Sequence, residues 1–386
     1  MEGLGIVGDF ISGGATYILP FLFVLTIVVF VHELGHFLMG RFFNTKIETF
    51  SIGFGREMFG FNDRHGTRWK FSWVPLGGYV KFWGDETAAS TPDIDALESV
   101  KNDPERSRCF HFKPVHQRAL IVAAGPFANF IFATIVFAAL FSIYGEPRIG
   151  TRIGEVLENS PAAAAGILAG DRVISIDGDP VTEFDEIRAA VMASGGDPLS
   201  LEVDRGGAPV TLQIVPAYEE MGGPVGGENK VWRIGLRPSG DEGNRTLIHH
   251  DPASALYRGA KANVDIISQS LAFIGRLIVG REDASHLSGP VGIARTSGEV
   301  AANLGLLSLI QLMAVLSVTV GMFNLFPIPM LDGGHLLYYA FEAVRGRPLG
   351  ERAQEFGFRI GLVLVGSLMV FATFNEIGRA SCRERV

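Results

Sequence analysis

His32, Glu33 and His36 form an HExxH sequence, in which the two histidines are four positions apart. On an α-helix this spacing puts both imidazoles on one face, where together they can hold one metal ion. Glu33 follows the first histidine, so its carboxylate is placed to polarise a water molecule at that metal. The three residues therefore predict a metal-dependent catalytic centre, although a bare HExxH also occurs by chance.

The surroundings of this motif make the prediction more specific. The motif lies inside an apolar run from about residue 17 to residue 43, which is long enough to cross a membrane as a helix. Ionisable side chains inside such a helix are costly and need a functional reason. The alternative is a buried helix of a soluble protein with hydrogen-bonded histidines, but the apolar run is too long for that structure.

A candidate third ligand follows a later apolar run, residues 304–326. The sequence NLFPIPMLDG begins at Asn324, and its prolines, Pro327 and Pro329, break the helix and force extended backbone. If this helix runs inward, Asp332 reaches the depth of the HExxH motif. Two histidines and one carboxylate leave an open tetrahedral position, as catalytic zinc requires. The alternative is that Asp332 only caps a helix.

The composition favours several membrane helices joined to soluble parts. The 386 residues are 47% hydrophobic, and their mean hydropathy is +0.27. This value is high for a soluble protein and low for an all-membrane one. A net charge of −8 without a basic stripe gives no sign of nucleic-acid binding. The two cysteines make no disulfide framework.

Basic residues indicate how the predicted helices are oriented. Arg41 ends the first apolar run, and Arg345, Arg347 and Arg352 lie between the third and fourth runs. By the positive-inside rule these residues face the cytoplasm, so both termini lie outside. The metal motif is then in the cytoplasmic half of the membrane. No Lys or Arg precedes the first run, which carries the motif, so we expect it to be retained and not removed as a signal peptide.

Residues 44–84 are predicted to form β structure. The segment 47–52 alternates like a strand, Gly53–Gly55 suggests a tight bend, and 69–82 reads as a second strand. Three of the four tryptophans fall here, and Trp favours the membrane interface. We expect a β-hairpin region that dips into the membrane beside the metal motif, where such backbone must be buried or line a cavity. A plain cytoplasmic hairpin is the alternative.

Residues 144–221 have a soluble composition and a regular series of predicted elements. Strands are expected at 153–156, 199–204 and 210–215, with a further strand between two turns within 168–178, and helices at 160–166 and 184–193. Their order, spacing and glycines resemble a bacterial PDZ domain, a fold that takes an extended peptide or a C-terminus along a sheet edge. A spacer that binds nothing is the alternative. The segment 222–281 lacks a second such pattern, so we expect one PDZ domain.

Three smaller features complete the chain. Segment 253–280 is amphipathic and is expected to lie on the membrane surface, followed by irregular chain at 288–294. Asn129, in a stretch of small residues, is a candidate for a hydrogen bond to the first helix, although packing alone explains the stretch equally well. Residues 376–386 are abruptly basic and look like translated sequencing-adapter DNA. We hypothesise that they are not native, which resequencing of the gene would test.

The predicted fold is a multi-pass α-helical membrane protein with four transmembrane helices, a β-hairpin region and one α+β PDZ domain. Its expected parts are the N-terminus and the first helix with HExxH (1–43), the re-entrant β region (44–84), a cytoplasmic connection (85–118), the second helix (119–143), the PDZ domain (144–221), a linker with the amphipathic segment (222–303), the third helix with the proline motif (304–335), the fourth helix (356–375) and the tail (376–386).

Four features in this order are similar to those of the bacterial site-2 protease family, in its regulator-of-sigma-E protease branch. They are HELGH, a GFG loop followed by PLGGYVKF, one PDZ-like segment and NLFPIPMLDGGH. The resemblance covers the chain to about residue 375. It implies an intramembrane zinc metalloendopeptidase of the inner membrane, with one Zn²⁺ held by His32, His36 and Asp332 and with Glu33 as the catalytic base.

The resemblance also implies substrates and further site residues. The substrates are single-pass membrane proteins, such as anti-sigma factors after a first periplasmic cut, and remnant signal peptides. The substrate-binding residues are expected to be Asn324, Gly53, Phe54, Gly55, Pro327 and Pro329. The best-known members carry two tandem PDZ domains, so a single one leaves open how uncut substrates are excluded. Two rival classes are a metal-ion transporter and a catalytically dead membrane scaffold. Transporters often contain internal repeats, and the sequence shows none, which argues against the first rival.

Overall fold

The computed structural model describes residues 2–85, 94–101, 103–222, 228–279 and 289–383. The chain divides into two compact units, which are described separately. The first unit comprises Met1–Phe137, Leu256–Ser270 and Leu287–Val386, and the second comprises Ala138–Ala255 and Leu271–His286. The predicted cytoplasmic connection, 85–118, lies partly outside the described residues.

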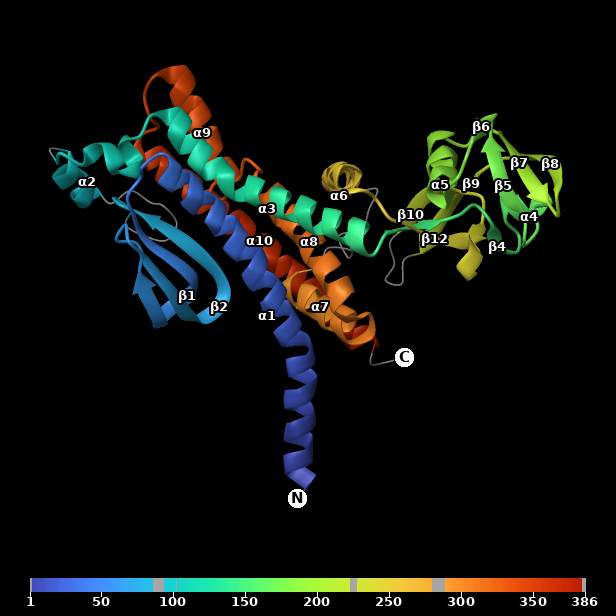
Figure 1. Ribbon diagram of the computed structural model, residues 1–386, viewed down its shortest axis with the longest axis horizontal. Helices are drawn as coiled ribbons and strands as arrows, with labels where there is room; N and C mark the ends of the chain where they lie inside the picture. The colour runs from blue at the N-terminus through green and yellow to red at the C-terminus, as the bar shows by residue number, and fades with distance from the viewer. Residues whose placement is uncertain (1, 86–93, 102, 223–227, 280–288, 384–386) are drawn as a thin grey trace. The chain divides into compact units, whose positions relative to one another are not determined.

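Four helices of the described chain are long and apolar enough to cross a membrane, as predicted. The candidate spans are Thr16–Phe42, Val115–Ile143, Gly305–Asn324 and Arg352–Phe371. They belong to α1 (Glu2–Phe42), α3 (Val115–Ile143), α8 (Gly305–Asn324) and α10 (Glu351–Arg383), which are labelled in Figure 1. α1 starts at Glu2, well before the predicted start at residue 17.

Close packing holds α1 against α3 and α8. A Cβ atom on Gly35 would lie 2.3 Å from the carbonyl oxygen of Ala124, so only glycine allows α1 and α3 to approach this closely. Val24 and Val28 of α1 are buried in one apolar cluster with Leu309 and Met313 of α8. The face of α1 that carries the HExxH motif is therefore enclosed by other helices.

The predicted β region is present as β1 (Ile47–Asn62) and β2 (Arg68–Phe82), which pair antiparallel. The first half of β1 is central, because Phe50 is paired with Trp69 on one side and with Val80 on the other. Phe50 is fully buried, whereas Trp73 is 68% exposed. The sheet lies beside the C-terminal part of α1 (Figure 1). A Cβ atom on Gly40 of α1 would lie 2.9 Å from Cε1 of Phe82 in this sheet. Its insertion in a membrane stays a prediction.

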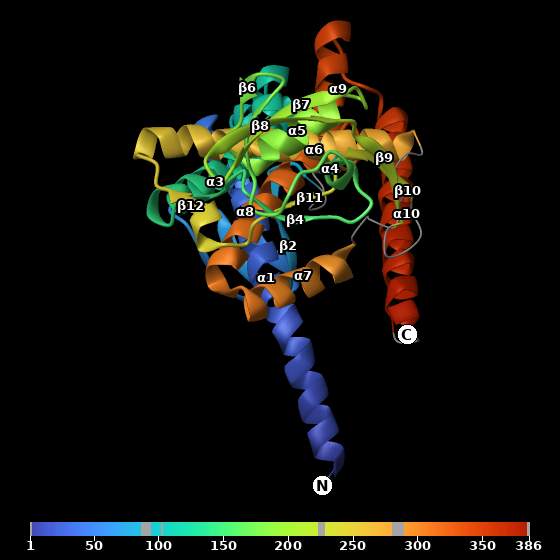
Figure 2. The ribbon, with the colours of Figure 1, turned by 90° about the vertical axis from the view of Figure 1, so that its right-hand side faces the viewer.

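Two helices appear where irregular chain or a loop was expected. α7 (Pro290–Asn303) begins with its proline at the first helical position, where the fixed φ favours a helix, so the Gly/Pro content was wrongly read as a break. Gly298 of α7 packs directly on Tyr17, and α7 crosses α1 in both views (Figures 1 and 2). α9 (Asp332–Arg345) follows the proline motif and ends at Gly346, which has a positive φ. The predicted amphipathic segment forms α6 (Pro252–Ile278).

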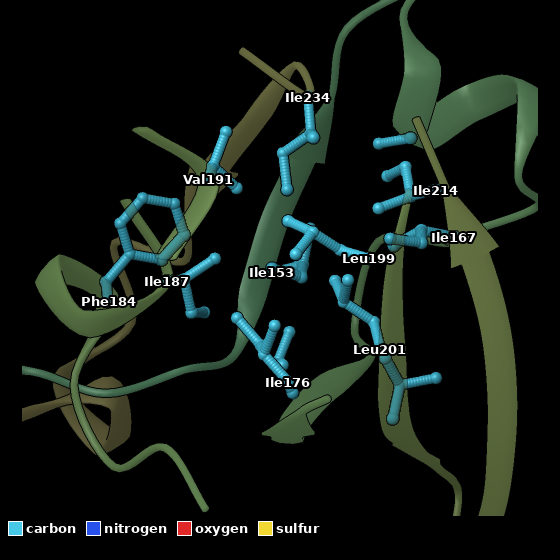
Figure 3. Packing of buried hydrophobic residues seen from close by; sticks show 13 residues of the cluster. Ile153, Ile167, Ile176, Phe184, Ile187, Val191, Leu199, Leu201, Ile214 and Ile234 are labelled. Carbon is cyan, nitrogen blue, oxygen red and sulfur yellow. The ribbon is translucent and has the colours of Figure 1, made fainter. Parts of the chain in front are cut away.

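The second unit contains the elements predicted for residues 144–221. These are β4 (Ile153–Val156), α4 (Pro161–Ala164), β5 (Arg172–Ile176), α5 (Phe184–Ala193), β7 (Leu199–Arg205) and β8 (Ala208–Ile214). Strands β6 (Asp179–Pro180), β5, β7 and β8 form one sheet in that order. Figure 3 shows the apolar side chains of these elements pointing toward one another, and Leu201 is fully buried among them.

This unit extends beyond residue 221, where a linker was expected. Ile234 lies in the same apolar core (Figure 3), and β11 (Leu236–Pro238) pairs with β4. The boundary was missed because this pairing joins strands that are far apart in the sequence. The remaining elements of the chain are α2 (Ile94–Val100), η1 (Arg106–Arg108), η2 (Phe110–Phe112), β3 (Glu146–Ile149), β9 (Ala217–Gly222), β10 (Glu228–Arg233), η3 (Glu242–Asn244) and β12 (Arg245–Ile248).

Candidate metal centre

The two histidines of the HExxH motif meet on one face of α1, as their spacing predicts. Their Nε2 atoms are 3.2 Å apart, and the residues are only 8% (His32) and 9% (His36) exposed. Such burial is unusual for histidines in an apolar helix unless they have partners.

Asp332 joins the two histidines from the start of α9, in a part of the first unit that is distant in the sequence. Its Oδ2 atom lies 3.1 Å from Nε2 of His32 and 3.5 Å from Nε2 of His36. This oxygen is buried, and within the described structure it accepts no hydrogen bond despite that proximity. Among the described residues, these three are the only group of His, Cys, Asp or Glu side chains whose ligand atoms converge in this way.

The geometry of these three atoms fits a zinc ion. Tetrahedral zinc with bonds of about 2.0–2.1 Å places neighbouring ligand atoms about 3.3 Å apart. The observed separations of 3.1, 3.2 and 3.5 Å bracket that value. A buried carboxylate oxygen without a hydrogen bond is costly, and a cation between the three atoms would satisfy it. His32, His36 and Asp332 could therefore hold one Zn²⁺ and leave a fourth position open.

The loop after α8 directs Asp332 to this place. A Cβ atom on Gly333 would lie 2.2 Å from the carbonyl oxygen of Phe326, and one on Gly334 would lie 2.4 Å from that of Ile328. The glycines after Asp332 are thus needed for the chain to fold back so tightly after the prolines. Asp332 occupies the first turn of α9, where a carboxylate is also favoured by the helix dipole.

Glu33 faces the β sheet beside the two histidines. A Cβ atom on Gly78 of β2 would lie 3.4 Å from Cγ of Glu33 and 3.4 Å from Cγ1 of Val29. The backbone of β2 therefore passes directly beside the candidate base. Sequence reasoning did not single out Gly78, although the paired glycines of PLGGYVKF were the available signal.

The residues of the predicted GFG loop belong to β1, the strand that pairs with β2. Gly53 and Gly55 both have a φ of +87°, but they lie inside the continuous strand β1, where its register with β2 shifts, so the bend predicted to end the strand at residue 52 was wrong. Gly53 packs against the backbone of β2, since a Cβ there would be 2.7 Å from the carbonyl oxygen of Val74. Phe54 stacks on Tyr79, with ring centroids 6.0 Å apart. The loop thus contacts β2, and it is Gly78 of β2 that packs on Glu33.

The other predicted substrate-binding residues lie at the end of α8 and just beyond it. Asn324 is the last residue of α8, and its Nδ2 atom donates a hydrogen bond to the carbonyl of Val320 at 3.0 Å. Pro327 is exposed, whereas Pro329 packs under Gly361 of α10. Their predicted contact with substrate remains a prediction.

Comparison with known proteins identifies the family. Residues 20–368 match the model of Peptidase family M50. The chain belongs to Peptidase family M50. A relative from Agrobacterium fabrum, which carries the provisional name zinc metalloprotease Atu1380, is 46% identical over 94% of this chain and 95% of its own. Metalloprotease MmpA of Caulobacter vibrioides is 41% identical over 93% of this chain and 94% of its own. This M50 chain is accordingly a zinc metalloprotease.

Solved structures of PDZ domains are similar to a small part of this M50 chain. The PDZ domain of HtrA3 bound to a phage-derived ligand is 29% identical over 19% of this chain and 81% of its own, with a TM-score of 0.17. This score is too low to carry an argument about the fold of the second unit. The single PDZ domain therefore stays a prediction.

Proposed function

We propose that this zinc metalloprotease is an intramembrane endopeptidase whose single Zn²⁺ is held by His32, His36 and Asp332. The observation that carries the proposal is the convergence of their three ligand atoms, 3.1–3.5 Å apart. Two of these residues lie in a helix that is apolar enough to cross a membrane, and the third follows another such helix. Their position supports a site that acts on peptide bonds within the bilayer.

The chemistry of the proposal divides between the metal and Glu33. Bound zinc polarises the carbonyl of the scissile peptide and makes water a better nucleophile. The Glu33 carboxylate takes a proton from the attacking water and passes it to the leaving amine. His32, His36 and Asp332 keep the site in place, and their low exposure limits the entry of bulk water.

A peptide bond in a membrane helix is shielded by the hydrogen bonds of that helix, so the substrate must be unwound. The β1–β2 sheet is suited to this task, because an extended peptide can pair with the main chain of a strand. The contact of Gly78 with Glu33 supports an arrangement in which such pairing occurs beside the base. Gly53, Phe54, Gly55, Asn324, Pro327 and Pro329 are the further residues that we expect to contact substrate.

The proposed setting is the inner membrane of a bacterium. Arg41 and the arginines between α9 and the start of α10 support an active site in the cytoplasmic half of the membrane, with both termini and the PDZ-like unit in the periplasm. The proposed substrates are single-pass membrane proteins, such as anti-sigma factors after a first periplasmic cut, and remnant signal peptides. This role is regulated intramembrane proteolysis, in which the PDZ-like unit takes a peptide or C-terminus. Membrane lipid is the other partner, and no nucleic acid is expected.

The test compares Glu33→Gln with the unmodified protein in liposomes that contain a single-pass test substrate. We expect Glu33→Gln to bind one zinc ion but to lose cleavage, and a zinc chelator to stop the unmodified protein. Glu355→Gln is the control, because Glu355 forms an exposed pair with Arg359 away from the metal centre, and we expect this variant to cleave normally. Cleavage by Glu33→Gln would reject its role as the base.

The same liposomes separate the rival classes. Zinc uptake by the unmodified protein without cleavage would indicate a transporter. Zinc binding without either uptake or cleavage would indicate a catalytically dead scaffold.

A further inference from the structure

The two candidate zinc ligands of α1 are both supported by α3, but in different ways. Nδ1 of His36 donates a hydrogen bond to the carbonyl of Ile121 at 2.9 Å. Nδ1 of His32 lies 3.3 Å from Nδ2 of Asn129. The predicted hydrogen bond from Asn129 to the first helix is thus present, and its partner is a metal-site residue.

The two contacts require different tautomers of the histidines. A neutral imidazole has one N–H, and its other nitrogen has a lone pair. The carbonyl of Ile121 can only accept, so His36 carries its proton on Nδ1 and directs a lone pair on Nε2 toward the site. An amide N–H aimed at Nδ1 of His32 requires the opposite tautomer, with the proton on Nε2, 3.2 Å from Nε2 of His36. In that tautomer Nε2 of His32, the nitrogen that faces Asp332, has no lone pair for a metal.

A second observation concerns the other end of the same amide. Asn129 is fully buried, and its Oδ1 atom has no hydrogen-bond partner in the described structure. A half-turn of the carboxamide exchanges Oδ1 with Nδ2, which have similar size. The exchanged amide would accept a hydrogen bond from a proton on Nδ1 of His32. This arrangement satisfies the buried oxygen and frees the Nε2 lone pair.

We propose that Asn129 is the positioning residue for His32: its Oδ1 accepts a hydrogen bond from Nδ1–H and so fixes the tautomer that binds zinc. The inference rests on the proposed function, in which His32 is a zinc ligand. Metal-bound histidines commonly donate their second N–H to an oxygen, which fixes the ring and makes it a better ligand. In this chain α3 provides both oxygens, a backbone carbonyl for His36 and a side-chain amide for His32.

The backbone of Asn129 is fixed by α8, the helix that leads to Asp332. Ser317 of α8 donates a hydrogen bond from Oγ to the carbonyl of Asn129 at 3.1 Å. A Cβ atom on Gly321 would lie 3.3 Å from Cβ of Asn129, so α8 approaches closely at this point. Asn129 therefore lies where α1, α3 and α8 meet, and its amide acts on His32 from a fixed position.

The experiment measures zinc affinity of the purified full chain by competition with a chromophoric chelator. Asn129→Leu has nearly the same size but cannot accept a hydrogen bond, and we expect it to bind zinc about 10–100-fold more weakly. Asn129→Asp keeps an acceptor beside Nδ1, so its zinc affinity should stay close to that of the unmodified protein. Asn263→Leu is the matched control. Asn263 is also buried and bonds α3, through Phe130 and Thr134, and we expect its loss to leave zinc affinity unchanged.

The visible spectrum of the Co²⁺-loaded protein gives a second readout, since it reports the geometry of the metal site. We expect it to change in Asn129→Leu and to stay the same in Asn263→Leu. Equal loss of zinc affinity in Asn129→Asp and Asn129→Leu would overturn the proposal, because it would mean that the amide acts as a donor. Unchanged affinity in Asn129→Leu would also overturn it. Unchanged affinity in His32→Ala would instead reject the proposed function.

Discussion

Gly125 of α3 lies directly against the imidazole of His36. A Cβ atom on Gly125 would be 2.3 Å from Nε2 and 2.5 Å from Cε1 of that ring. No side chain fits in this space unless the histidine moves, because atoms that are not bonded do not approach so closely. The absence of a side chain at residue 125 therefore determines where the Nε2 lone pair of His36 points.

We expect Gly125→Ala to weaken zinc binding about 10–100-fold, an effect comparable with the loss of a residue that orients a metal ligand. The measurement is zinc affinity by chelator competition, together with cleavage of a test substrate. Gly366→Ala in α10 is the control, since its Cβ would meet no described atom within 4 Å. If Gly125→Ala bound zinc as tightly as Gly366→Ala, the packing of His36 would not control the site.

Removal of the third ligand should have a different result from removal of the base. Asp332→Asn keeps the shape of the side chain but removes the anionic oxygen that lies 3.1 Å from His32. We expect the purified Asp332→Asn protein to lose its zinc during dialysis against a chelator, whereas Glu33→Gln retains it. Metal analysis of the dialysed proteins checks this prediction. Equal zinc content in the two variants would contradict the assignment of Asp332.

An ion pair near the start of α3, inside the candidate span Val115–Ile143, holds α9 to α3. Arg118 donates to Glu342 at 2.6 Å, and the two side chains are only 12% and 14% exposed. Arg118→Ala leaves Glu342 buried and unpaired, which we expect to reduce stability by about 3–5 kcal/mol. Because α9 begins at Asp332, zinc affinity should fall as well.

Thermal unfolding of the detergent-solubilised protein measures this effect. The matched control is Arg359→Ala, which breaks an exposed pair with Glu355 that contributes about 0.3–0.5 kcal/mol. Similar unfolding temperatures for the two variants would show that the Arg118 pair does not stabilise the protein.

The second unit should respond to acid through Asp171. Hydrogen bonds from the Arg205 guanidinium, which outweigh the opposing effect of burial, hold the pKa of Asp171 below its usual range. A lowered folded-state pKa contributes stability above the unfolded value of about 3.9, and this contribution is lost as pH falls through the folded value. Asp171→Asn should therefore reduce stability by about 1.5–3 kcal/mol near neutral pH, and the difference should narrow on acidification.

Hydrogen exchange of the β5 and β7 amides, corrected for the intrinsic effect of pH, measures the stability of this unit. Glu155→Gln is the control, because Glu155 and Arg237 form an exposed pair whose loss should have little effect at any pH. A difference between Asp171→Asn and the unmodified protein that grew in acid would contradict the assigned direction of the pKa shift.

Elements with a local sequence signal were predicted well. The helix expected at 184–193 is α5 (Phe184–Ala193), because Glu183 and Glu186 form a capping box directly before its apolar positions. The apolar spans were equally clear from hydropathy. Elements that depend on distant partners were missed. β11 belongs to the second unit only because it pairs with β4. α7 was missed for another reason: its proline and glycines are usually breakers, but its one proline, Pro290, stands at the first helical position.

The residues of the metal centre were likewise predicted only in part. The spacing of His32 and His36 and the prolines before Asp332 were sufficient to predict which three residues meet. The groups that orient them were harder to find. The Ile121 carbonyl has no sequence signal, and the roles of Gly125 and Gly78 depend on how α1 sits against α3 and β2, which one sequence does not reveal.

The three converging side chains come from the first membrane helix and from the segment that follows the third. During synthesis α1 leaves the ribosome long before Asp332 does, so its histidines and Glu33 enter the bilayer without their acidic partner. A partly synthesised chain already has Glu33 and the β1–β2 sheet, but under the proposed function it lacks the third zinc ligand. Under the proposed function, proteolytic activity would begin only after Asp332 has been made and α9 has docked, so that most of the chain must be complete before the enzyme can act.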